Sequence, residues 1–270
     1  MTIEAYAKVN FTLDVYGVRT DGYHALRSVV MPISLSDTIT LTPANEISSN
    51  TGYDDDLCLK AARALDPTRG VQISVVKRIP AGGGLGGGSA DAAAVLRALN
   101  KLWGLNMPLS ELAEFGAQIG SDVPALVLGG PVLMEGRGEK VQSLQSPTLN
   151  LVVVNPGVHC STAEVYAACD ARSQAQVSPT DCMIDALKGG DLARIATATS
   201  NDLQPAAVKL HPEIADALVS LRTAGALGVT MTGSGSCVFG FAPDAKTAER
   251  ISSELNFKGF QSWFVTTKEI

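Results

Sequence analysis

Six glycines fall within seven residues, from Gly82 to Gly88, and Leu85 is the one other residue in this run. The alternating residues 71–75 before the run predict a strand, and the alanine-rich segment after Ser89 carries leucines at helical spacing. Glycines let a ligand approach the backbone closely, and a helix start offers unpaired N–H groups at the positive end of the helix dipole. This order of strand, glycine loop and helix predicts an anion site, and the usual anion is a phosphate.

The glycine run could also be a flexible linker, a Walker A loop or a dinucleotide-binding loop. A flexible linker would lack the apolar segments that stand on both sides of this run. A Walker A loop needs a lysine followed by serine or threonine after its last glycine, and Ser89-Ala90 stands there instead. The spacing Gly82-x-Gly84-x-x-Gly87 formally fits a dinucleotide fingerprint, although so many glycines match it by chance. A dinucleotide-dependent oxidoreductase therefore stays an alternative at this point.

Two charged residues far from this loop could also take part in chemistry. Residues 3–16 alternate between apolar and polar and predict a long strand, with Lys8 and Asn10 on its polar side. This pattern alone favours Lys8 as a solvent-facing lysine. Asp122 precedes Pro124 at the expected start of a short helix, where it could cap the helix, face a cleft, or do both.

The elements that position these residues follow from apolar periodicity and turn signals. In the first half we expect a turn at Asp21-Gly22, strands at 28–35 and 38–42 separated by a turn at Ser36-Asp37, helices at 54–65 and 109–120, and a hairpin at 132–144. In the second half we expect strands at 149–154, 229–232, 237–241 and 262–267, and helices after Ser161, within 180–199, at 206–224 and at 245–255. The second half is close to a split-βαβ layout. The segment 145–147 predicts a boundary between domains 1–147 and 148–270.

Composition narrows the class of protein. The chain has 270 residues, of which 46% are hydrophobic, and its formal net charge is −6. A surface of this charge argues against a nucleic-acid partner. No apolar run is long enough to cross a membrane, and the first ten residues do not follow a signal-peptide pattern, which favours the cytoplasm. The five cysteines contain no CxxC pair, so neither a zinc cage nor a disulfide framework is indicated.

Three segments together resemble the GHMP kinases, a family named for galactokinase, homoserine, mevalonate and phosphomevalonate kinases. They are the strand around Lys8, the loop PAGGGLGGGSADAA from Pro80, and MTGSGSCVFG at 231–240. Further stretches resemble the branch of this family that acts on a CDP-linked methylerythritol. These stretches are DGYH at 21–24, QIGSDVP at 118–124, NPGVHCSTAEVY at 155–166 and NDLQP at 201–205.

The resemblance implies an α+β fold of two domains with a cleft between them. The first would be a mixed sheet with helices, similar to domain 2 of ribosomal protein S5, and the second a ferredoxin-like split βαβ. It implies transfer of the ATP γ-phosphate, with Mg²⁺, to the 2-hydroxyl of the CDP-linked methylerythritol in non-mevalonate isoprenoid precursor biosynthesis. A monomer or weak homodimer is expected. Another kinase of the family, such as a homoserine or mevalonate kinase, and an inactive nucleotide sensor on the same fold stay alternatives.

The resemblance also assigns roles to particular positions. Lys8 and Asp122 match the two catalytic positions. The ATP phosphate loop would consist of Pro80, Ala81, Gly82, Gly83, Gly84, Leu85, Gly86, Gly87, Gly88, Ser89 and Ala90. The second substrate would be bound by Asn10, Tyr23, His24, Thr162 and Tyr166. Several relatives hold magnesium with a serine and a glutamate; Ser89 fits the serine and no glutamate is identified, so the phosphates and water would mainly hold the metal.

Overall fold

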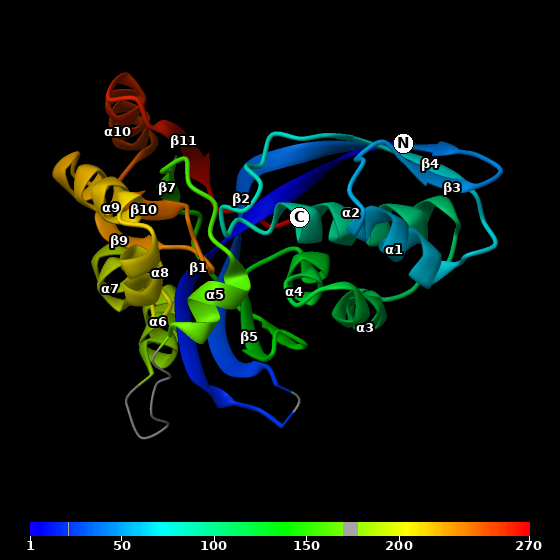
Figure 1. The fold of residues 1–270 in the computed structure, drawn as a ribbon, viewed down its shortest axis with the longest axis horizontal. Helices are drawn as coiled ribbons and strands as arrows, with labels where there is room; N and C mark the ends of the chain where they lie inside the picture. The colour runs from blue at the N-terminus through cyan, green and yellow to red at the C-terminus, as the bar shows by residue number, and fades with distance from the viewer. Residues whose placement is uncertain (21, 170–177) are drawn as a thin grey trace.

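The computed structural model describes residues 1–20, 22–169 and 178–270, and its two sheets are flanked by helices (Figure 1). The larger sheet contains β1 (Thr2–Val18), β2 (His24–Pro43), β3 (Ile47–Ser49), β4 (Val71–Val76), β5 (Val132–Gly136), β6 (Lys140–Ser143) and β8 (Ser200–Asn201). The smaller sheet contains β7 (Asn150–Asn155), β9 (Leu227–Met231), β10 (Val238–Ala242) and β11 (Gln261–Thr266). Both parallel and antiparallel pairs occur in the larger sheet, so the mixed sheet that the sequence predicted is confirmed.

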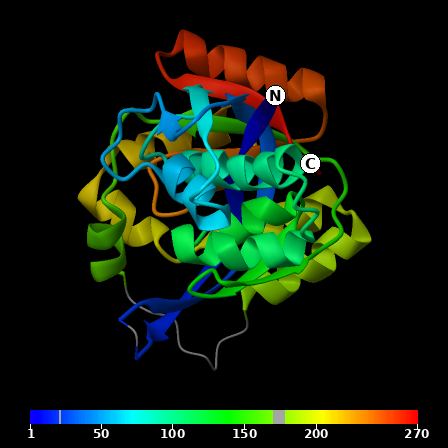
Figure 2. The same cartoon turned by 90° about the vertical axis from the view of Figure 1, so that its right-hand side faces the viewer.

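Helices lie on both sides of the long β1–β2 ribbon. One side carries α1 (Leu57–Leu65), α2 (Gly87–Leu102), α3 (Leu109–Ile119) and α4 (Val123–Leu128). Towards the other side lie α5 (Thr162–Ala167), α6 (Pro179–Gly189), α7 (Leu192–Ala198), α8 (Gln204–Leu210), α9 (Glu213–Thr223) and α10 (Ala245–Phe257). Figure 2 shows α10 and β11 at the opposite end of the molecule from the β1–β2 turn.

Strand β1 is buried on both faces, which the alternation of its sequence did not predict. Lys8, Asn10, Thr12 and Asp14 are all buried, although they occupy the polar side of the alternating pattern. The pairing of β1 with β2 shifts register at Tyr6/Lys8 and again at Asn10/Thr12, and such irregularities bend a strand and re-aim its side chains. Elements of both halves then pack on the strand and exclude water from its polar side.

Strand β2 runs without a break through the expected turn at Ser36-Asp37, so that prediction is wrong. The Asp37 side chain is fully buried, and its Oδ1 accepts the backbone N–H groups of Arg78 at 2.5 Å and Ile79 at 2.8 Å. A residue typical of turns is thus held within a strand by partners forty residues later in the chain. These bonds also fix the segment that leads from β4 into the glycine run.

The helices α1 and α2 have different starts. Asp56 caps α1 by accepting the Cys58 N–H at 2.7 Å, so the helix begins three residues later than the sequence predicted. Helix α2 begins directly at the glycine run, with Gly86 in the left-handed region at its N-terminus. Its buried face includes Ala90 and the alanines 92–94, whose small side chains let α2 pack against β1.

The second half forms the ferredoxin-like sheet that the sequence predicted. Its strands lie in the order β11-β7-β10-β9, and all three neighbouring pairs are antiparallel. The helix expected at 206–224 is divided into α8 and α9, because Pro212 lacks the N–H of a helix interior and its ring restricts His211.

Strand β8, which belongs to the second half of the chain, is part of the larger sheet. It pairs in parallel with β1, where Ser200 lies opposite Thr12 and Asn201 lies opposite Leu13. Aromatic packing adds a further contact, because Phe11 of β1 lies 4.9 Å from Phe241 of β10 between ring centroids. The two halves are therefore joined along β1, and the boundary at 145–147 stays a prediction.

Candidate active site

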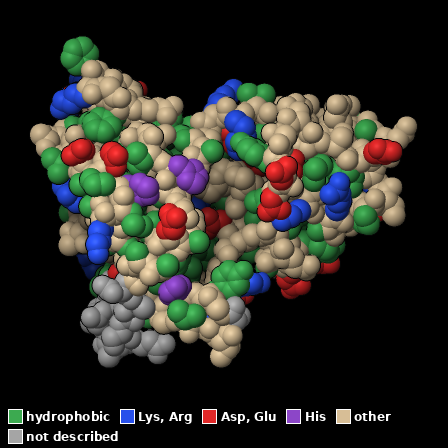
Figure 3. Space-filling view, in the orientation of Figure 1, with side chains coloured by type: hydrophobic (Ala, Val, Ile, Leu, Met, Phe, Trp, Pro, Cys, Tyr) green, Lys and Arg blue, Asp and Glu red, His purple; other side chains and the backbone are tan. Residues whose placement is uncertain are grey.

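A cavity of about 980 Å³ opens between the two halves of the chain, and the surface is visibly hollowed there (Figure 3). Its lining includes the whole glycine run, β1 at Lys8 and Asn10, the start of α4, and helix α5. The loop that follows β9 forms another wall through Gly233, Ser234 and Gly235. Segments from five separate parts of the sequence therefore meet at one hollow.

The glycine run lines the cavity with backbone. Gly82, Gly84 and Gly86 have φ angles of +68°, +73° and +68°, which lie in the left-handed region that favours glycine. Residues 80–89 all line the cavity, whereas Ala90 is buried within α2 and donates its N–H to the carbonyl oxygen of Gly86. The run therefore brings a loop without large side chains to the N-terminus of a sixteen-residue helix, which is the arrangement expected of a phosphate site.

Close neighbours explain why a larger residue would not fit at two of these glycine positions. A Cβ atom on Gly84 would lie 2.2 Å from the carbonyl oxygen of Thr232, and one on Gly86 would lie 3.1 Å from the side-chain carbons of Lys8. The glycine run is therefore packed directly against β1 on one side and against the loop after β9 on the other.

Lys8 and Asp122, which the sequence separates by more than a hundred residues, meet beside this run. Lys8 Nζ lies 3.3 Å from Asp122 Oδ2, and the two side chains are 4% and 26% exposed. The Lys8 backbone N–H donates to the carbonyl oxygen of Leu85 at 3.0 Å, so the strand is tied to the glycine run at this point. Lys8 is thus a buried ammonium that faces a more accessible carboxylate, and its expected exposure to solvent is wrong.

Asp122 stands at the first position before α4, yet its side chain makes no capping hydrogen bond. The interpretation of Asp122 as a helix cap is therefore wrong, because the carboxylate is oriented towards Lys8 instead. The helix geometry still serves the site, since Pro124 and the turn at Ser121 fix the position of Asp122. Both residues that matched catalytic positions line the same cavity.

Asn10 holds the Lys8 ammonium from the other side. Its Oδ1 accepts a hydrogen bond from Lys8 Nζ at 2.7 Å, and its Nδ2 donates to Ser28 Oγ at 2.8 Å. The Ser28 hydroxyl in turn donates to the carbonyl oxygen of Thr12 at 2.6 Å, so it has no second proton to offer Asn10. This chain fixes the orientation of the Asn10 amide and hence the position of the amine.

The second glycine loop, Met231–Ser236, closes the site from the other half of the chain. Thr232 Oγ1 accepts the Asn10 N–H at 3.0 Å and lies 3.4 Å from the carbonyl oxygen of Gly84. Thr232 was not among the residues assigned from the sequence. The available signal was its place within the segment MTGSGSCVFG at 231–240, directly before Gly233.

All five residues assigned to the second substrate line the cavity, and Asn10 is the one bonded to Lys8. The His24 and Tyr166 rings lie 5.2 Å apart between centroids, and Thr162 Oγ1 lies 2.9 Å from Ser234 Oγ. Burial raises the pKa of the Tyr166 hydroxyl above its usual value, and the nearby Asp122 charge adds to this effect. These three residues and Tyr23 therefore line the same cavity as Lys8 and Asp122.

Arg137 is a cavity residue that sequence reasoning missed. Its guanidinium lies over the Tyr23 ring, 5.3 Å from the centroid, in a geometry typical of a cation–π contact. The signal was the placement of one arginine between Gly136 and Gly138 at the tip of a hairpin. This cation lies at the same end of the cavity as His24 and Tyr166.

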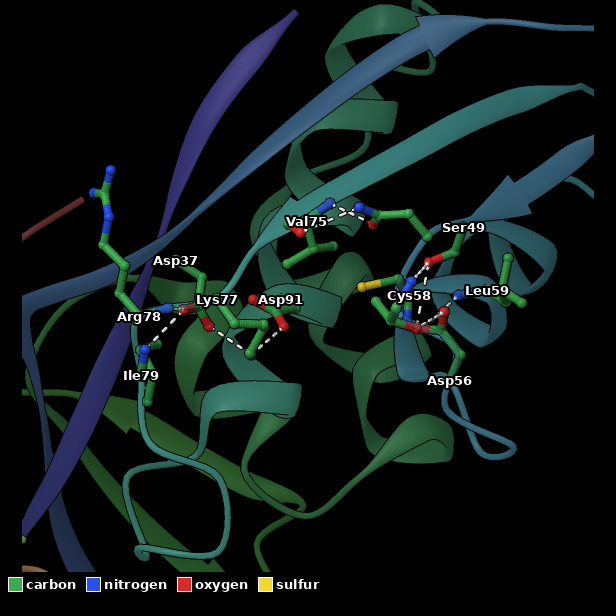
Figure 4. Close-up of polar contacts among 12 residues, drawn as sticks. Asp37, Ser49, Asp56, Cys58, Leu59, Val75, Lys77, Arg78, Ile79 and Asp91 are labelled. Carbon is green, nitrogen blue, oxygen red and sulfur yellow. Dashed lines mark hydrogen bonds and ion pairs between the residues drawn. The ribbon is translucent and has the colours of Figure 1, made fainter.

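A cluster of charges lies beside the first glycine run, where two buried carboxylates meet the partly exposed ammonium of Lys77 (Figure 4). Lys77 Nζ lies 2.5 Å from Asp37 Oδ2 and 2.6 Å from Asp91 Oδ2. Burial raises the pKa of Asp91 to about 7, which the Lys77 charge opposes and the Asp37 charge reinforces. One ammonium thus pairs with two carboxylates and leaves one negative charge uncompensated when both are ionised. It also links the end of β4 to the second turn of α2.

The described residues offer neither a metal cluster nor a membrane-spanning helix. Across residues 1–20, 22–169 and 178–270, no group of three or more His, Cys, Asp or Glu side chains is arranged to hold a metal ion. No helix within those ranges is both long and apolar enough to traverse a bilayer. The polar side chains nearest the glycine run that line the cavity include Ser89, Asp91 and Asp122.

Comparisons with known proteins agree on one family. Residues 56–130 match the family described as GHMP kinases N terminal domain, and residues 183–261 match GHMP kinases C terminal. A protein of Caldanaerobacter subterraneus subsp. tengcongensis named 4-diphosphocytidyl-2-C-methyl-D-erythritol kinase is 40% identical over 100% of this chain and 97% of its own length. A protein of the same name from Pelotomaculum thermopropionicum is 42% identical over 94% of this chain and 93% of its own.

Solved structures extend the likeness to the fold. A crystal structure of 4-(cytidine 5'-diphospho)-2C-methyl-D-erythritol kinase matches with a TM-score of 0.86 and 34% identity over the full length of both chains. A homoserine kinase from Cytophaga hutchinsonii matches with a TM-score of 0.79 and 20% identity, over 100% of this chain and 94% of its own. At 20% identity, the match to the homoserine kinase supports the fold alone.

Proposed function

This chain belongs to the GHMP kinase family and is an ATP-dependent small-molecule kinase, and we propose that its acceptor is the 2-hydroxyl of 4-diphosphocytidyl-2-C-methyl-D-erythritol. The identity of about 40% to two proteins of that name, along nearly the whole chain, supports this acceptor. The observation that carries the mechanism is the convergence of Lys8 and Asp122 beside the first glycine run. The reaction would belong to isoprenoid precursor biosynthesis.

The triphosphate of ATP would lie along the backbone of the first glycine run. Backbone N–H groups at the start of α2 would bind the phosphate oxygens, and the positive end of the helix dipole would favour their charge. The left-handed turns at Gly82, Gly84 and Gly86 allow the ligand to lie against the main chain. Binding of this kind orients the γ-phosphate towards the acceptor, and phosphoryl transfer depends mainly on such positioning and on charge neutralisation.

Lys8 and Asp122 would carry out the proton and charge steps. Asp122 is the more exposed of the two and would accept the proton of the acceptor hydroxyl as the bond to phosphorus forms. Lys8 would stabilise the developing alkoxide and the charge on the transferring phosphoryl group. Its bond to Asn10 Oδ1 keeps the amine in place without neutralising it, because an amide oxygen carries no net charge.

The CDP part of the acceptor would occupy the end of the cavity with Tyr23, His24 and Tyr166. Aromatic faces suit stacking on a pyrimidine, and each such stack is worth roughly 1–3 kcal/mol. The Arg137 guanidinium is suited to a nearby diphosphate, because arginine binds phosphate oxygens through a planar fork of donors. Asn10 and Thr162 would then lie near the reacting hydroxyl.

Magnesium would enter with ATP as part of the substrate. Since the described residues contain no cluster of three metal-ligating side chains, the phosphates and water would supply most ligands. The Ser89 hydroxyl and the Asp122 carboxylate line the cavity and could complete the coordination. The bound ion would neutralise phosphate charge during transfer.

The direct test is ADP release by the purified protein with magnesium ATP and the CDP-linked alcohol. Lys8→Met and Asp122→Asn should each lower kcat by at least about 100-fold, the range of a lost general base, while ATP still binds. Lys188→Met and Asp185→Asn are matched controls, because this exposed pair on α6 has the same chemistry and an N–O distance of 3.4 Å. A near-normal rate in either site variant would remove that residue from the mechanism.

The same assay separates the alternatives. Turnover of homoserine or mevalonate without turnover of the CDP-linked alcohol would assign the chain to another branch of the family. Nucleotide binding without transfer to any of the three alcohols would support a nucleotide sensor. A thermal shift with NAD would support the dinucleotide alternative. We also propose a cytoplasmic location and a monomer or weak homodimer with no nucleic-acid partner, which the net charge of −6 supports in part.

A further inference from the structure

The segment Asn201–Pro205, which begins in β8 and leads into α8, has no role in the mechanism above. It is fixed to β1 by two hydrogen bonds of Asp202. The Asp202 N–H donates to the carbonyl oxygen of Leu13 at 2.9 Å, and Asp202 Oδ2 accepts the Val15 N–H at 2.9 Å. Since β1 also carries Lys8, this segment is positioned relative to the same strand as the proposed catalytic amine.

The Asn201 side chain connects this segment to the second glycine loop. Its Nδ2 donates to the carbonyl oxygens of Met231 and Gly233, both at 2.8 Å, and its Oδ1 accepts the Leu203 N–H at 2.9 Å. Asn201 is 8% exposed. Both amide protons are thus used on the loop, and the backbone donor on Oδ1 fixes which way the amide points.

The loop held in this way contacts the groups at the centre of the site. A Cβ atom on Gly233 would lie 3.0 Å from the carbonyl oxygen of Gly84 and 3.3 Å from Lys8 Nζ. Gly233 and Gly235 have φ angles of +57° and +91°, so the loop has glycine's wide range of backbone conformations. Because its glycines allow many backbone conformations, this loop needs hydrogen bonds from neighbouring elements to keep a single conformation.

We propose that Asn201 is a positioning residue for phosphoryl transfer. Its amide holds the second glycine loop against Lys8 and the first glycine run, and so keeps the amine at the place where the γ-phosphate arrives. The proposal rests on the proposed function, because the role of Lys8 is defined there. Asn201 does not line the cavity and would act through the loop.

Gln204, three residues later, offers a matched control. Its Oε1 accepts the Thr230 hydroxyl at 3.0 Å and the Met231 N–H at 2.9 Å. Gln204→Glu keeps an acceptor oxygen for both donors. Asn201→Asp makes the same change from amide to carboxylate, but it replaces two donated protons with an oxygen that faces two carbonyl oxygens. The same change from amide to carboxylate should therefore disturb the second glycine loop at position 201 and leave it intact at position 204.

The first readout is steady-state kinetics with magnesium ATP and the CDP-linked alcohol. Asn201→Asp should lower kcat by about tenfold or more, as expected from the loss of two hydrogen bonds, and Gln204→Glu should keep kcat within about twofold of the wild type. In a Lys8→Met background, Asn201→Asp should cause little further loss, because Asn201 acts through Lys8. A purely structural role would give additive losses that follow the melting temperature.

The second readout needs no enzymatic activity. Deuterium uptake by peptides that cover the second glycine loop should be about tenfold faster in Asn201→Asp than in Gln204→Glu or the wild type. Faster uptake together with an inactive wild-type protein would refute the proposed function and leave the loop contact established. Faster uptake with an unchanged kcat in the variant would overturn the positioning role.

Asn201→Ala is the second variant, since it removes the donors without adding a charge. Normal kcat and normal uptake in either variant would overturn the proposal. If both variants fail to fold, Asn201 serves stability alone and the proposal is likewise overturned.

Discussion

Replacing Gly84 by alanine should destabilise the protein and disrupt the contact between the two glycine loops. Gly84 has a φ of +73°, and its new Cβ would lie 2.2 Å from the backbone carbonyl oxygen of Thr232. An alanine in the left-handed region costs about 1–2 kcal/mol. The carbonyl oxygen of Thr232 must also move, although it accepts the Gly235 N–H at 3.0 Å, and Thr232 Oγ1 accepts the Asn10 N–H. Two weakened hydrogen bonds add about 0.5–1.5 kcal/mol each, so the free energy of unfolding should fall by roughly 2–5 kcal/mol.

Gly88→Ala is the matched control, four residues along the same run. Gly88 lies within α2, and its Cβ would meet a single atom, Leu57 Cδ1, at an ordinary contact distance of 3.6 Å. Alanine is favoured over glycine in helices by up to about 1 kcal/mol. The stability of this variant should therefore be unchanged or raised by that amount.

Urea denaturation followed by tryptophan fluorescence measures both effects, because Trp103 follows α2 and Trp263 lies in β11. Gly84→Ala should unfold at a lower urea concentration and bind ATP more weakly, whereas Gly88→Ala should unfold at or above the wild-type midpoint. Equal destabilisation by the two substitutions would refute the reasoning, since it would show that glycine is needed throughout the run and not at particular crowded positions.

Three further substitutions test other contacts. The wild-type pKa of Asp91 is about 7 against an ordinary value of 3.8; ionisation therefore opposes folding, and stability from this group is lost as pH rises through that window. The Asp91→Asn variant carries no group that ionises there, so it should not lose this stability. Its free energy of unfolding relative to the wild type should rise by on the order of 4 kcal/mol between pH 4 and 7, because about 3 pH units contribute about 1.4 kcal/mol each. Equal pH dependence of stability in the two proteins would contradict this expectation. Tyr166→Leu should raise the KM for the CDP-linked alcohol by roughly 5- to 100-fold with little change in the KM for ATP, and an equal rise in both would argue against base stacking. Thr232→Val should lower kcat by about 2- to 10-fold, and Thr232→Ser should restore it because the hydroxyl that accepts the Asn10 N–H returns; loss in both variants would assign the effect to packing.

Local sequence patterns predicted the phosphate site at the first glycine run, the helix that follows it and the succession of strands and helices along the second half. These features depend on residues that are close together in the chain, such as the alternation before Gly82 and the alanines after Ser89. The prediction of a phosphate site at this run therefore needed only glycine chemistry and helix electrostatics, whereas ATP as the ligand came from resemblance. The pairing of Lys8 with Asp122 came from resemblance, since neither local pattern pointed to the other residue.

Tertiary partners account for the predictions that were wrong. Asp37 was assigned to a turn because aspartate is common in turns, but Lys77 and the backbone after β4 hold it within β2. Lys8 was expected at the surface because β1 alternates, but elements of both halves bury the polar side of the strand. For Asp122 the sequence left a helix cap and a position facing a cleft open, and the carboxylate pairs with the buried Lys8 ammonium rather than with the N–H groups of α4.

The hydrogen bond between the Asn10 N–H and Thr232 Oγ1 spans 222 positions of the chain. During synthesis on the ribosome, at least 232 of the 270 residues must be made before this bond can form. Until then the second glycine loop does not cover the polar side of β1. A strand with exposed backbone edge groups can pair wrongly in a nascent polypeptide. Folds rich in such distant pairings form slowly. Because Thr232 comes so late in the chain, the proposed catalytic centre is one of the last parts of the nascent protein to be completed.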